Sequence, residues 1–197
     1  MSHTPHSRPA GPAPDAASLQ EAALDYLARY AATEAGLRRV LERRIDRWAL
    51  KAAAENDRDS IAGSVEVAKR AVPEIVARLV AAGAVSDTAF AASRARNLVR
   101  AGRSHRAVVA HLAAKGVGTD TARAALPDDA DSELAAALAL ARRRRIGPFR
   151  AGGAPDASGR QRELAVLARA GFPQDVAREA LTLDPNEAEE MVLRLRR

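Results

Sequence analysis

Apolar residues recur with helical spacing along most of the chain beyond residue 18. In residues 37–48 the apolar side chains fall on one helical face, and arginines occupy much of the rest of that segment. The residues on this face are Leu37, Val40, Leu41, Ile45 and Trp48. Comparable stripes follow, separated by short breaks rich in Gly, Ser and Asp. The pattern predicts an all-α protein built from amphipathic helices.

The breaks between stripes carry recognisable helix start and stop signals. An apolar run ends at Gly83, a typical C-cap residue, and Ser86 with Asp87 offers side-chain acceptors to the next helix. Ser104 similarly predicts the start of a helix. Pro73 suits a first helical turn, so we expect a new helix to begin near it. Residues 51–70 read as an extension of the preceding helix, a loop and a new helix start leading into residues 72–84, and they form an inserted segment in the repeat plan.

An internal repeat appears when the sequence is compared with itself at an offset of 55 residues. Residues 104–126 then overlie residues 159–181, and both read as helix, Gly, short loop, Asp cap and helix. The matched pairs include Leu112 with Leu167, Gly116 with Gly171, Asp120 with Asp175, and Ala122 with Ala177. The N-terminal part fits the same plan less clearly. We therefore predict an elongated array of tandem three-helix repeats.

The repeat pattern divides the chain into four expected segments. These are a disordered tail (1–18), a first repeat (19–85) with an inserted segment near 51–70, a second repeat (86–127), and a third repeat (128–197) with a loop near 148–159. The tail prediction rests on its Pro, Ala, Gly and Ser content, which provides little apolar mass for a core.

Composition agrees with a helical protein and removes several kinds of chemistry. Of the 197 residues 47% are hydrophobic but only 3% aromatic, which favours a core of Leu, Val, Ile and Ala. There is no cysteine, which excludes disulfides, cysteine-ligated zinc and a thiol nucleophile. No apolar run approaches the roughly 18 residues of a membrane span, and the first residues lack secretory-signal features. We expect a cytoplasmic protein with no membrane contact.

The sequence contains no recognisable catalytic or metal-binding cluster. His3 and His6 lie in the expected tail, while His105 and His111 are six residues apart and so lie on different faces of one helix. Two acidic clusters stand beside predicted helix starts, where the helix dipole favours negative charge. They are Asp128, Asp129 and Asp131, and Glu187, Glu189 and Glu190. Phosphate-loop and nucleophile-elbow motifs are missing. We expect no enzyme activity, no cofactor and no metal.

Arginine is the residue type that points to a function. Lys and Arg exceed Asp and Glu by 31 to 25, which gives a net charge of +6, and the arginines form three clusters. The candidate partner-binding residues are Arg38, Arg39, Arg43, Arg94, Arg96, Arg100, Arg103, Arg106, Arg142, Arg143, Arg144 and Arg145. Such clusters can bind phosphates or acidic protein surfaces. A high-GC genome produces the same excess without function, and residues 142–145 are also what a solvated helix C-terminus favours.

Four stretches together resemble the RecX family, the bacterial regulators of the RecA recombinase. They are "ALDYLARYAATEAGLRRVLERRI" (23–45), "VARLVAAGAVSDTAFAASRARN" (76–97), "GRSHRAVVAHLAAKGV" (102–117) and "LARRRRIGPFR" (140–150), in the family's order. The most specific piece is the joint between the first and second repeats, carried by Leu79, Gly83, Asp87, Phe90 and Ala91. The resemblance covers residues 19–181.

The resemblance implies a modular regulator with no catalytic residues. It implies binding in the helical groove of the RecA filament on single-stranded DNA, with inhibition of the ATPase, strand exchange and co-protease activities of RecA in recombination and the SOS response. It also implies a weak contact with DNA, and we expect a monomer. Two other readings stay open: a sequence-independent nucleic-acid binder that uses the same arginines on phosphates, and a helical scaffold for another protein. If the protein is such a scaffold, charge reversal at Arg94, Arg96 and Arg100 should leave its partner binding unchanged.

Overall fold

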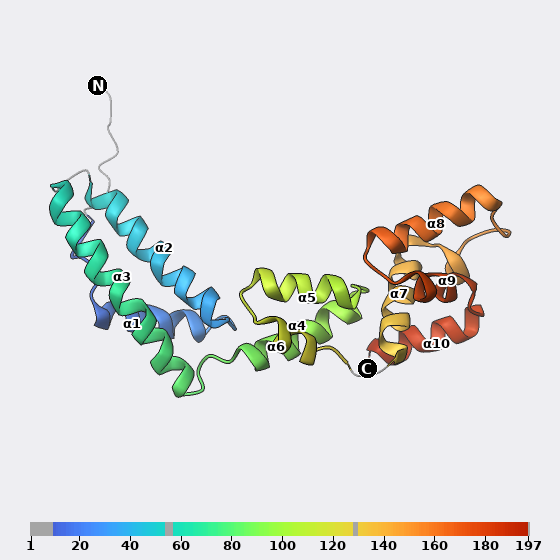
Figure 1. The fold of residues 1–197 in the computed structure, drawn as a ribbon, viewed down its shortest axis with the longest axis horizontal. Coiled ribbons are helices and arrows are strands. Elements are labelled where there is room, and N and C mark those ends of the chain that lie inside the picture. Colours follow the sequence, from blue (N-terminus) through green and yellow to red (C-terminus); the bar gives the residue numbers. More distant parts are fainter. Residues whose placement is uncertain (1–9, 54–56, 128–129, 197) are drawn as a thin grey trace, which may run out of the picture. The chain divides into compact units, whose positions relative to one another are not determined.

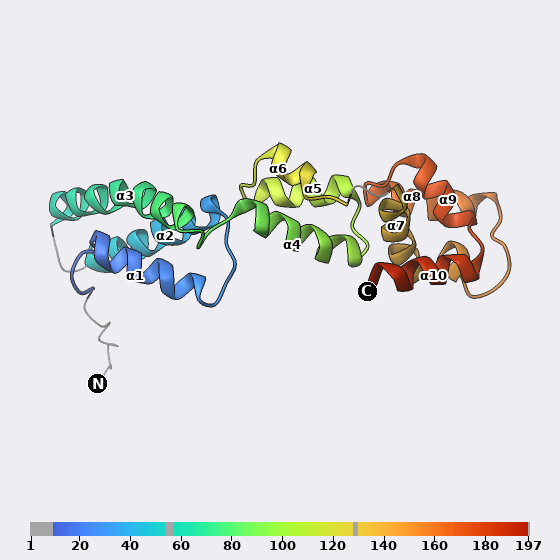
Figure 2. The ribbon, with the colours of Figure 1, turned by 90° about the horizontal axis from the view of Figure 1, so that it is seen from below.

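The computed structural model describes residues 10–53, 57–127 and 130–196, and this part of the chain is all helical (Figures 1 and 2). The prediction of an all-α fold is confirmed. The helices are α1 (Ala16–Leu27), α2 (Glu34–Ala52), α3 (Arg58–Ala81), α4 (Asp87–Arg100), α5 (His105–Ala114), α6 (Thr119–Ala124), α7 (Ala130–Arg144), α8 (Ala157–Arg169), α9 (Gln174–Thr182) and α10 (Pro185–Arg196), with a 3-10 turn, η1, at Gly147–Phe149.

The chain divides into two compact units, residues 1–87 and 88–197. The first unit is built from α1, α2 and α3, and its core is the predicted apolar stripe of α2 packed against α3 and α1. Leu37, Leu41 and Ile45 of α2 are fully buried, as the helical spacing predicts. They pack with Leu19, Ala23, Ala68, Val72, Ile75, Val76, Leu79 and Val85.

Residues 51–70 contain the end of α2 at Ala52 and the start of α3 at Arg58, as expected, but the helix start at Pro73 is wrong. α3 runs unbroken for 24 residues, and Pro73 lies inside it. Ala68, Val72 and Ile75, on both sides of the proline, are buried in the core of the first unit. This packing offsets the backbone hydrogen bond that a mid-helix proline removes. Residues 54–56 of the expected insertion lie outside the described residues.

The folded chain begins before Ser18, where the sequence pattern places the end of a disordered tail. Asp15 caps α1, accepting from the Ser18 backbone N–H at 2.8 Å, while Ser18 Oγ accepts from the Asp15 N–H at 3.1 Å. This reciprocal capping box starts α1 ahead of Leu19, the first buried residue of the helix. Trp48 Nε1 also donates to the Gly11 carbonyl oxygen at 3.1 Å. Residues 1–9 of the expected tail lie outside the described part.

The second unit contains the three-helix groups α4–α6 and α7–α9, followed by α10, around one continuous core. The internal repeat is visible in it: Leu112 and Leu167 are both fully buried, and Gly116 and Gly171 both have φ of +93°. The expected Asp caps are wrong. Gly118 and Pro173 occupy the N-cap positions, and both aspartates, Asp120 and Asp175, lie in the first turn. There their charge meets the helix dipole without capping a backbone N–H.

Hydrogen bonds at the start of α5 join the two helix groups of the second unit. Ser104 is fully buried, and its Oγ donates to the Ala170 carbonyl at 2.8 Å while accepting from the Ala107 N–H at 3.2 Å. The carboxylate of Glu133 on α7 accepts from the His105 backbone N–H at 3.1 Å and lies 2.7 Å from His105 Nδ1. The contacts of Ser104 with Ala170 and of His105 with Glu133 link residues far apart in the sequence, so they fix the loop after α4 against α7 and the α8–α9 turn.

Candidate partner-binding surface

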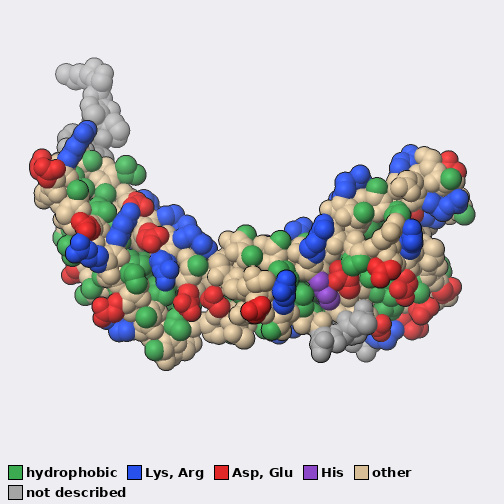
Figure 3. Space-filling model, viewed as in Figure 1, with side chains coloured by type: hydrophobic (Ala, Val, Ile, Leu, Met, Phe, Trp, Pro, Cys, Tyr) green, Lys and Arg blue, Asp and Glu red, His purple; other side chains and the backbone are tan. Residues whose placement is uncertain are grey.

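The candidate arginines predicted from the sequence are exposed, except Arg142, which is half-buried and has its Nη1 buried without a hydrogen-bond partner. Arg38, Arg39 and Arg43 are exposed on α2, on the side away from the buried stripe. The face of the molecule in Figure 3 shows basic side chains gathered over α2 in the first unit and over α8 in the second, with acidic ones over α9 and α10. The candidates of the first unit therefore form a set of their own on one helix.

The second unit brings two of the predicted arginine clusters together. Arg143 Nη1 donates to the Ala101 carbonyl at 2.6 Å, across 42 residues of sequence. Arg100, Arg142 and Arg143 also line one surface hollow with Ala101 and Ala139. The end of α4 and the end of α7 thus present their arginines on a shared surface.

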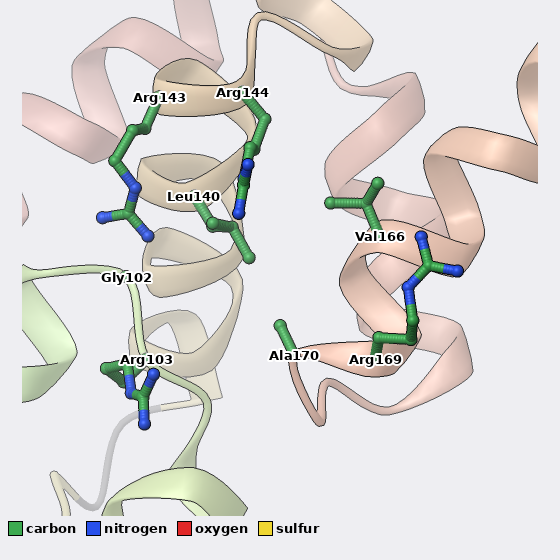
Figure 4. A pocket seen from close by; sticks show the side chains of 8 residues that line it. All are labelled: Gly102, Arg103, Leu140, Arg143, Arg144, Val166, Arg169 and Ala170. Carbon is green, nitrogen blue, oxygen red and sulfur yellow. The ribbon is translucent and has the colours of Figure 1, made fainter.

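A second hollow beside this contact is the most basic feature of the unit, and we call it the arginine pocket (Figure 4). Its volume is about 350 Å³. Its lining consists of Gly102, Arg103, Leu140, Arg143, Arg144, Val166, Arg169 and Ala170. Arg103 comes from the loop after α4, Arg143 and Arg144 from the end of α7, and Arg169 from the end of α8. Each of three segments that are separate in the sequence therefore contributes at least one arginine.

The pocket has an apolar part as well as a basic one. Leu140 and Val166 extend toward the space between α7 and α8, and Ala170 lies beside them at the turn that follows α8 (Figure 4). Arg144 runs into the same space, whereas Arg143 turns toward the Gly102 loop. Arginine groups thus stand next to an aliphatic patch within one hollow.

The positive charge of the pocket is not balanced by acidic neighbours. No Asp or Glu is among the lining residues, and within the described part of the chain the side chains of Arg103, Arg144 and Arg169 have no ion-pair or hydrogen-bond partner. Two carboxylates elsewhere in this unit are held by other arginines, Glu189 by Arg142 at 3.0 Å and Glu163 by Arg150. The pocket arginines are therefore available to an acidic partner.

The positive charges of this surface also affect the pKa of His111 on α5. Burial, together with the charges of Arg94, Lys115 and Arg103, holds the pKa of His111 below its usual value. Arg94 Nε donates to His111 Nε2 at 3.2 Å, so the neutral ring is the hydrogen-bonded form. Arg94 is thus committed to an intramolecular contact and faces α5.

Local backbone geometry explains how the arginines reach one place. Gly102 has φ of +75°, and a Cβ there would lie 2.9 Å from the Leu140 backbone nitrogen, so only glycine lets the loop approach α7 so closely. The next residue is Arg103. α7 ends at Arg144, and Arg145 adopts a left-handed φ of 56°, with the arginines at the helix C-terminus, where cations are favoured.

Three other predicted arginines of the second unit lie outside the pocket. Arg96 and Arg100 line a hollow of about 310 Å³ with Arg194, Met191 and Leu195. Arg106 lies against the α8–α9 turn, since a Cβ at Gly171 would come 3.2 Å from its Nε. Arg169 and Arg194 were not predicted from the sequence. Each lies outside the three clusters in the sequence, and only the packing of the helices shows that it lines a hollow together with arginines of those clusters.

The structure also places the residues considered for metal or acid–base chemistry. His105 pairs with Glu133 and His111 with Arg94, on different faces of α5. Among the residues that the structure describes, no group of three or more His, Asp or Glu side chains is placed to hold a metal ion. Glu187 lies in the first turn of α10, and Asp128 and Asp129 lie outside the described residues. Within the described ranges, no helix is both long and apolar enough to cross a membrane.

Comparison with known proteins identifies the family. A family model for the second three-helix domain of RecX matches residues 86–126, which contain α4–α6. The Regulatory protein RecX of Myxococcus xanthus is 38% identical over 169 residues, which cover 85% of this chain and 86% of the relative. The chain belongs to the RecX family. The resemblance drawn from the sequence is thereby confirmed.

Further RecX proteins agree with this assignment. The Regulatory protein RecX of Mycobacterium marinum is 37% identical over 141 residues, covering 67% of this chain and 78% of that protein. The crystal structure of RecX from Lactobacillus salivarius superposes with a TM-score of 0.60 at 17% identity, covering 89% of this chain and 97% of that one. This second likeness concerns the fold alone. On the RecX fold, the arginine pocket lies between the second and third helix groups.

Proposed function

We propose that this RecX chain binds the RecA filament on single-stranded DNA and inhibits RecA ATPase, strand exchange and co-protease activity. Membership of a regulatory protein family supports this proposal. The observation that carries it is the arginine pocket, where four arginines from three segments line one hollow and no acidic residue is among the lining residues. Like charges gathered in this way destabilise the folded chain, and a negatively charged partner offsets that cost.

Several weak contacts would give the binding its strength. Basic clusters lie on α2, at the end of α4 and at the end of α7, and a filament repeats its own surface at regular intervals. Contacts that are weak singly add up when one chain reaches several of them at once. Inhibition then follows because a chain held along the filament obstructs the movement and growth of RecA subunits.

The steady-state ATPase of the cognate RecA on single-stranded DNA tests the proposal. We expect the rate to fall when this protein is added well below one molecule per RecA. The double variant Arg144→Glu, Arg169→Glu should inhibit more weakly, because it reverses two pocket charges. The matched control is Arg123→Glu, Arg178→Glu, which makes the same charge change at exposed positions outside the pocket in the same unit. An ATPase rate that this protein leaves unchanged contradicts the proposal.

A direct nucleic-acid-binding role has one observation in its favour. Trp48 lines a hollow of about 550 Å³ on the first unit together with Arg44, Arg47 and Lys51. An aromatic ring among basic side chains is the combination that binds single-stranded nucleic acid. This role predicts DNA binding without RecA that weakens steeply with added salt, and that Trp48→Ala reduces. Such binding, with an unchanged RecA ATPase, would replace the first proposal.

A further inference from the structure

We propose that the arginine pocket receives an acidic peptide segment in which an aliphatic side chain is flanked by carboxylates. The inference deepens the proposed function, on which it rests in taking the partner to be a protein. It assigns to the pocket a ligand class that combines charge with an apolar group. The segment would lie between the end of α7, the end of α8 and the Gly102 loop.

The charge of the pocket calls for more than one negative group. Arg103, Arg144 and Arg169 have no intramolecular partner in the described residues, and Arg143 spends one donor on the Ala101 carbonyl. Each guanidinium presents a planar set of donors that matches a carboxylate in a two-point contact. A single carboxylate would leave most of these donors unused, so a run of acidic residues fits better than one.

The aliphatic part of the lining selects the rest of the ligand. The side chains of Val166 and Ala170 are half-buried and offer no hydrogen bond, and water against them is released when an apolar group covers them, whereas Leu140 is only 5% exposed. The pocket volume of about 350 Å³ lies in the range of sites that enclose small ligands. An aliphatic side chain can occupy the space between α7 and α8 while its acidic neighbours reach the arginines at the rim.

The same lining is a poor fit to a nucleic acid strand. Single-strand binding sites combine basic side chains with aromatic rings on which bases stack, and no aromatic residue lines this pocket. A sugar–phosphate chain would use the arginines but would gain little from Leu140 and Val166. Trp48, which could serve as such a ring, belongs to the first unit. A peptide uses both parts of the lining, and this favours it over nucleic acid.

A purely structural role for these arginines makes a different prediction. Arg144 and Arg169 end α7 and α8, where cations stabilise the helix dipole. If that were their whole role, reversing their charge would lower the stability of the second unit without changing the affinity for a peptide. Thermal unfolding therefore has to be measured beside binding for each variant.

The test uses the full chain and a fluorescein-labelled 12-residue peptide centred on Glu-Glu-Leu-Glu-Glu, with binding followed by fluorescence anisotropy at low ionic strength. The pocket variant Arg144→Glu, Arg169→Glu should bind the peptide at least about tenfold more weakly. The control variant Arg123→Glu, Arg178→Glu carries the same net charge and should bind nearly as the wild type does. Replacing the central Leu of the peptide by Ser should weaken binding about fivefold.

Any of the following results would overturn the inference. They are equal losses in the pocket and control variants, equal affinity for the Leu and Ser peptides, and loss of oligo-dT binding in the pocket variant while peptide binding persists. If the pocket variant unfolds, Arg169→Gln, which removes one charge without reversing it, takes its place. Peptide affinity that is unchanged in both pocket variants would also overturn the inference.

The RecA ATPase measured on the same samples separates this inference from the proposed function. Inhibition by the wild type without peptide binding would refute the peptide site and leave RecA binding intact. Peptide binding that depends on the pocket, with an unchanged ATPase, would support the peptide site and point to a partner other than RecA.

Discussion

Arg94 and His111 show how one residue pair is tuned by its surroundings. The imidazole accepts a hydrogen bond from Arg94 through Nε2, so the neutral ring carries its proton on Nδ1. Lys115 and Arg103 add positive charge, and burial adds a desolvation cost, so the pKa of His111 is lowered. Protonation would break the hydrogen bond and place a cation among cations. The histidine therefore belongs to the packing of α4 on α5.

This pair predicts a pH dependence of stability with a definite sign. The unfolded chain takes up a proton at His111 near pH 6.5, whereas the folded chain does so at lower pH. Above about pH 7 the ring is neutral in both states, and as the pH falls below about 6.5 the unfolded state gains protons first, so the unfolding free energy decreases. His111→Gln keeps an acceptor for Arg94 and does not titrate. Urea unfolding at pH 7, 6 and 5 should show a smaller loss for this variant, and an equal loss would refute the assignment.

Several helix boundaries could be predicted from the sequence, because their signals are local. Ser104 begins α5, and Gly83 and Gly102, which follow α3 and α4, both adopt positive φ. Pro73 failed as a signal because the buried face of α3 on α2 outweighs the local preference of proline. Arg169 could not be found from the sequence, since a lone arginine at a helix end carries no mark of what lies opposite it.

Two glycines at helix ends should respond differently to the same substitution. Gly83 and Gly102 have similar φ, +72° and +75°, so alanine costs about 1 kcal/mol of backbone strain at either one. A Cβ at Gly83 meets open space, whereas at Gly102 it would lie 2.9 Å from the Leu140 nitrogen and 3.1 Å from the Ala136 oxygen. We expect Gly102→Ala to lower the unfolding free energy of its unit by clearly more than Gly83→Ala lowers that of the other unit.

Denaturant unfolding with tryptophan fluorescence and circular dichroism measures both variants. Gly102→Ala should also weaken peptide binding, because the loop that carries Arg103 has to move away from α7. Equal destabilisation by the two substitutions would show that backbone strain alone sets the cost. The contact between the Gly102 loop and α7 would then contribute nothing to the shape of the pocket.

At the scale of the whole molecule, the sequence indicated three repeats, whereas packing within the described residues forms two cores. α4–α6 share a continuous core with α7–α10, and α1–α3 have a separate one. The bond from Ser104 to Ala170 spans 66 residues, and no local pattern announces it. Repeats that look alike in sequence can thus differ in how tightly they join, because the joining contacts are few and distant in the chain.

Because the two cores are separate, a substitution that destabilises one unit should leave the stability of the other unchanged. Leu41 of α2 and Leu138 of α7 are both fully buried, so truncation of either to Ala should cost about 2–5 kcal/mol. Leu41→Ala should speed amide hydrogen exchange in residues 10–87 alone, and Leu138→Ala in residues 88–196 alone, as measured by mass spectrometry in mild denaturant. Since the arginine pocket lies in the second unit, Leu41→Ala should also leave peptide binding unchanged at temperatures where that unit stays folded. Faster exchange throughout the chain from either substitution would mean that the two cores unfold as one cooperative structure.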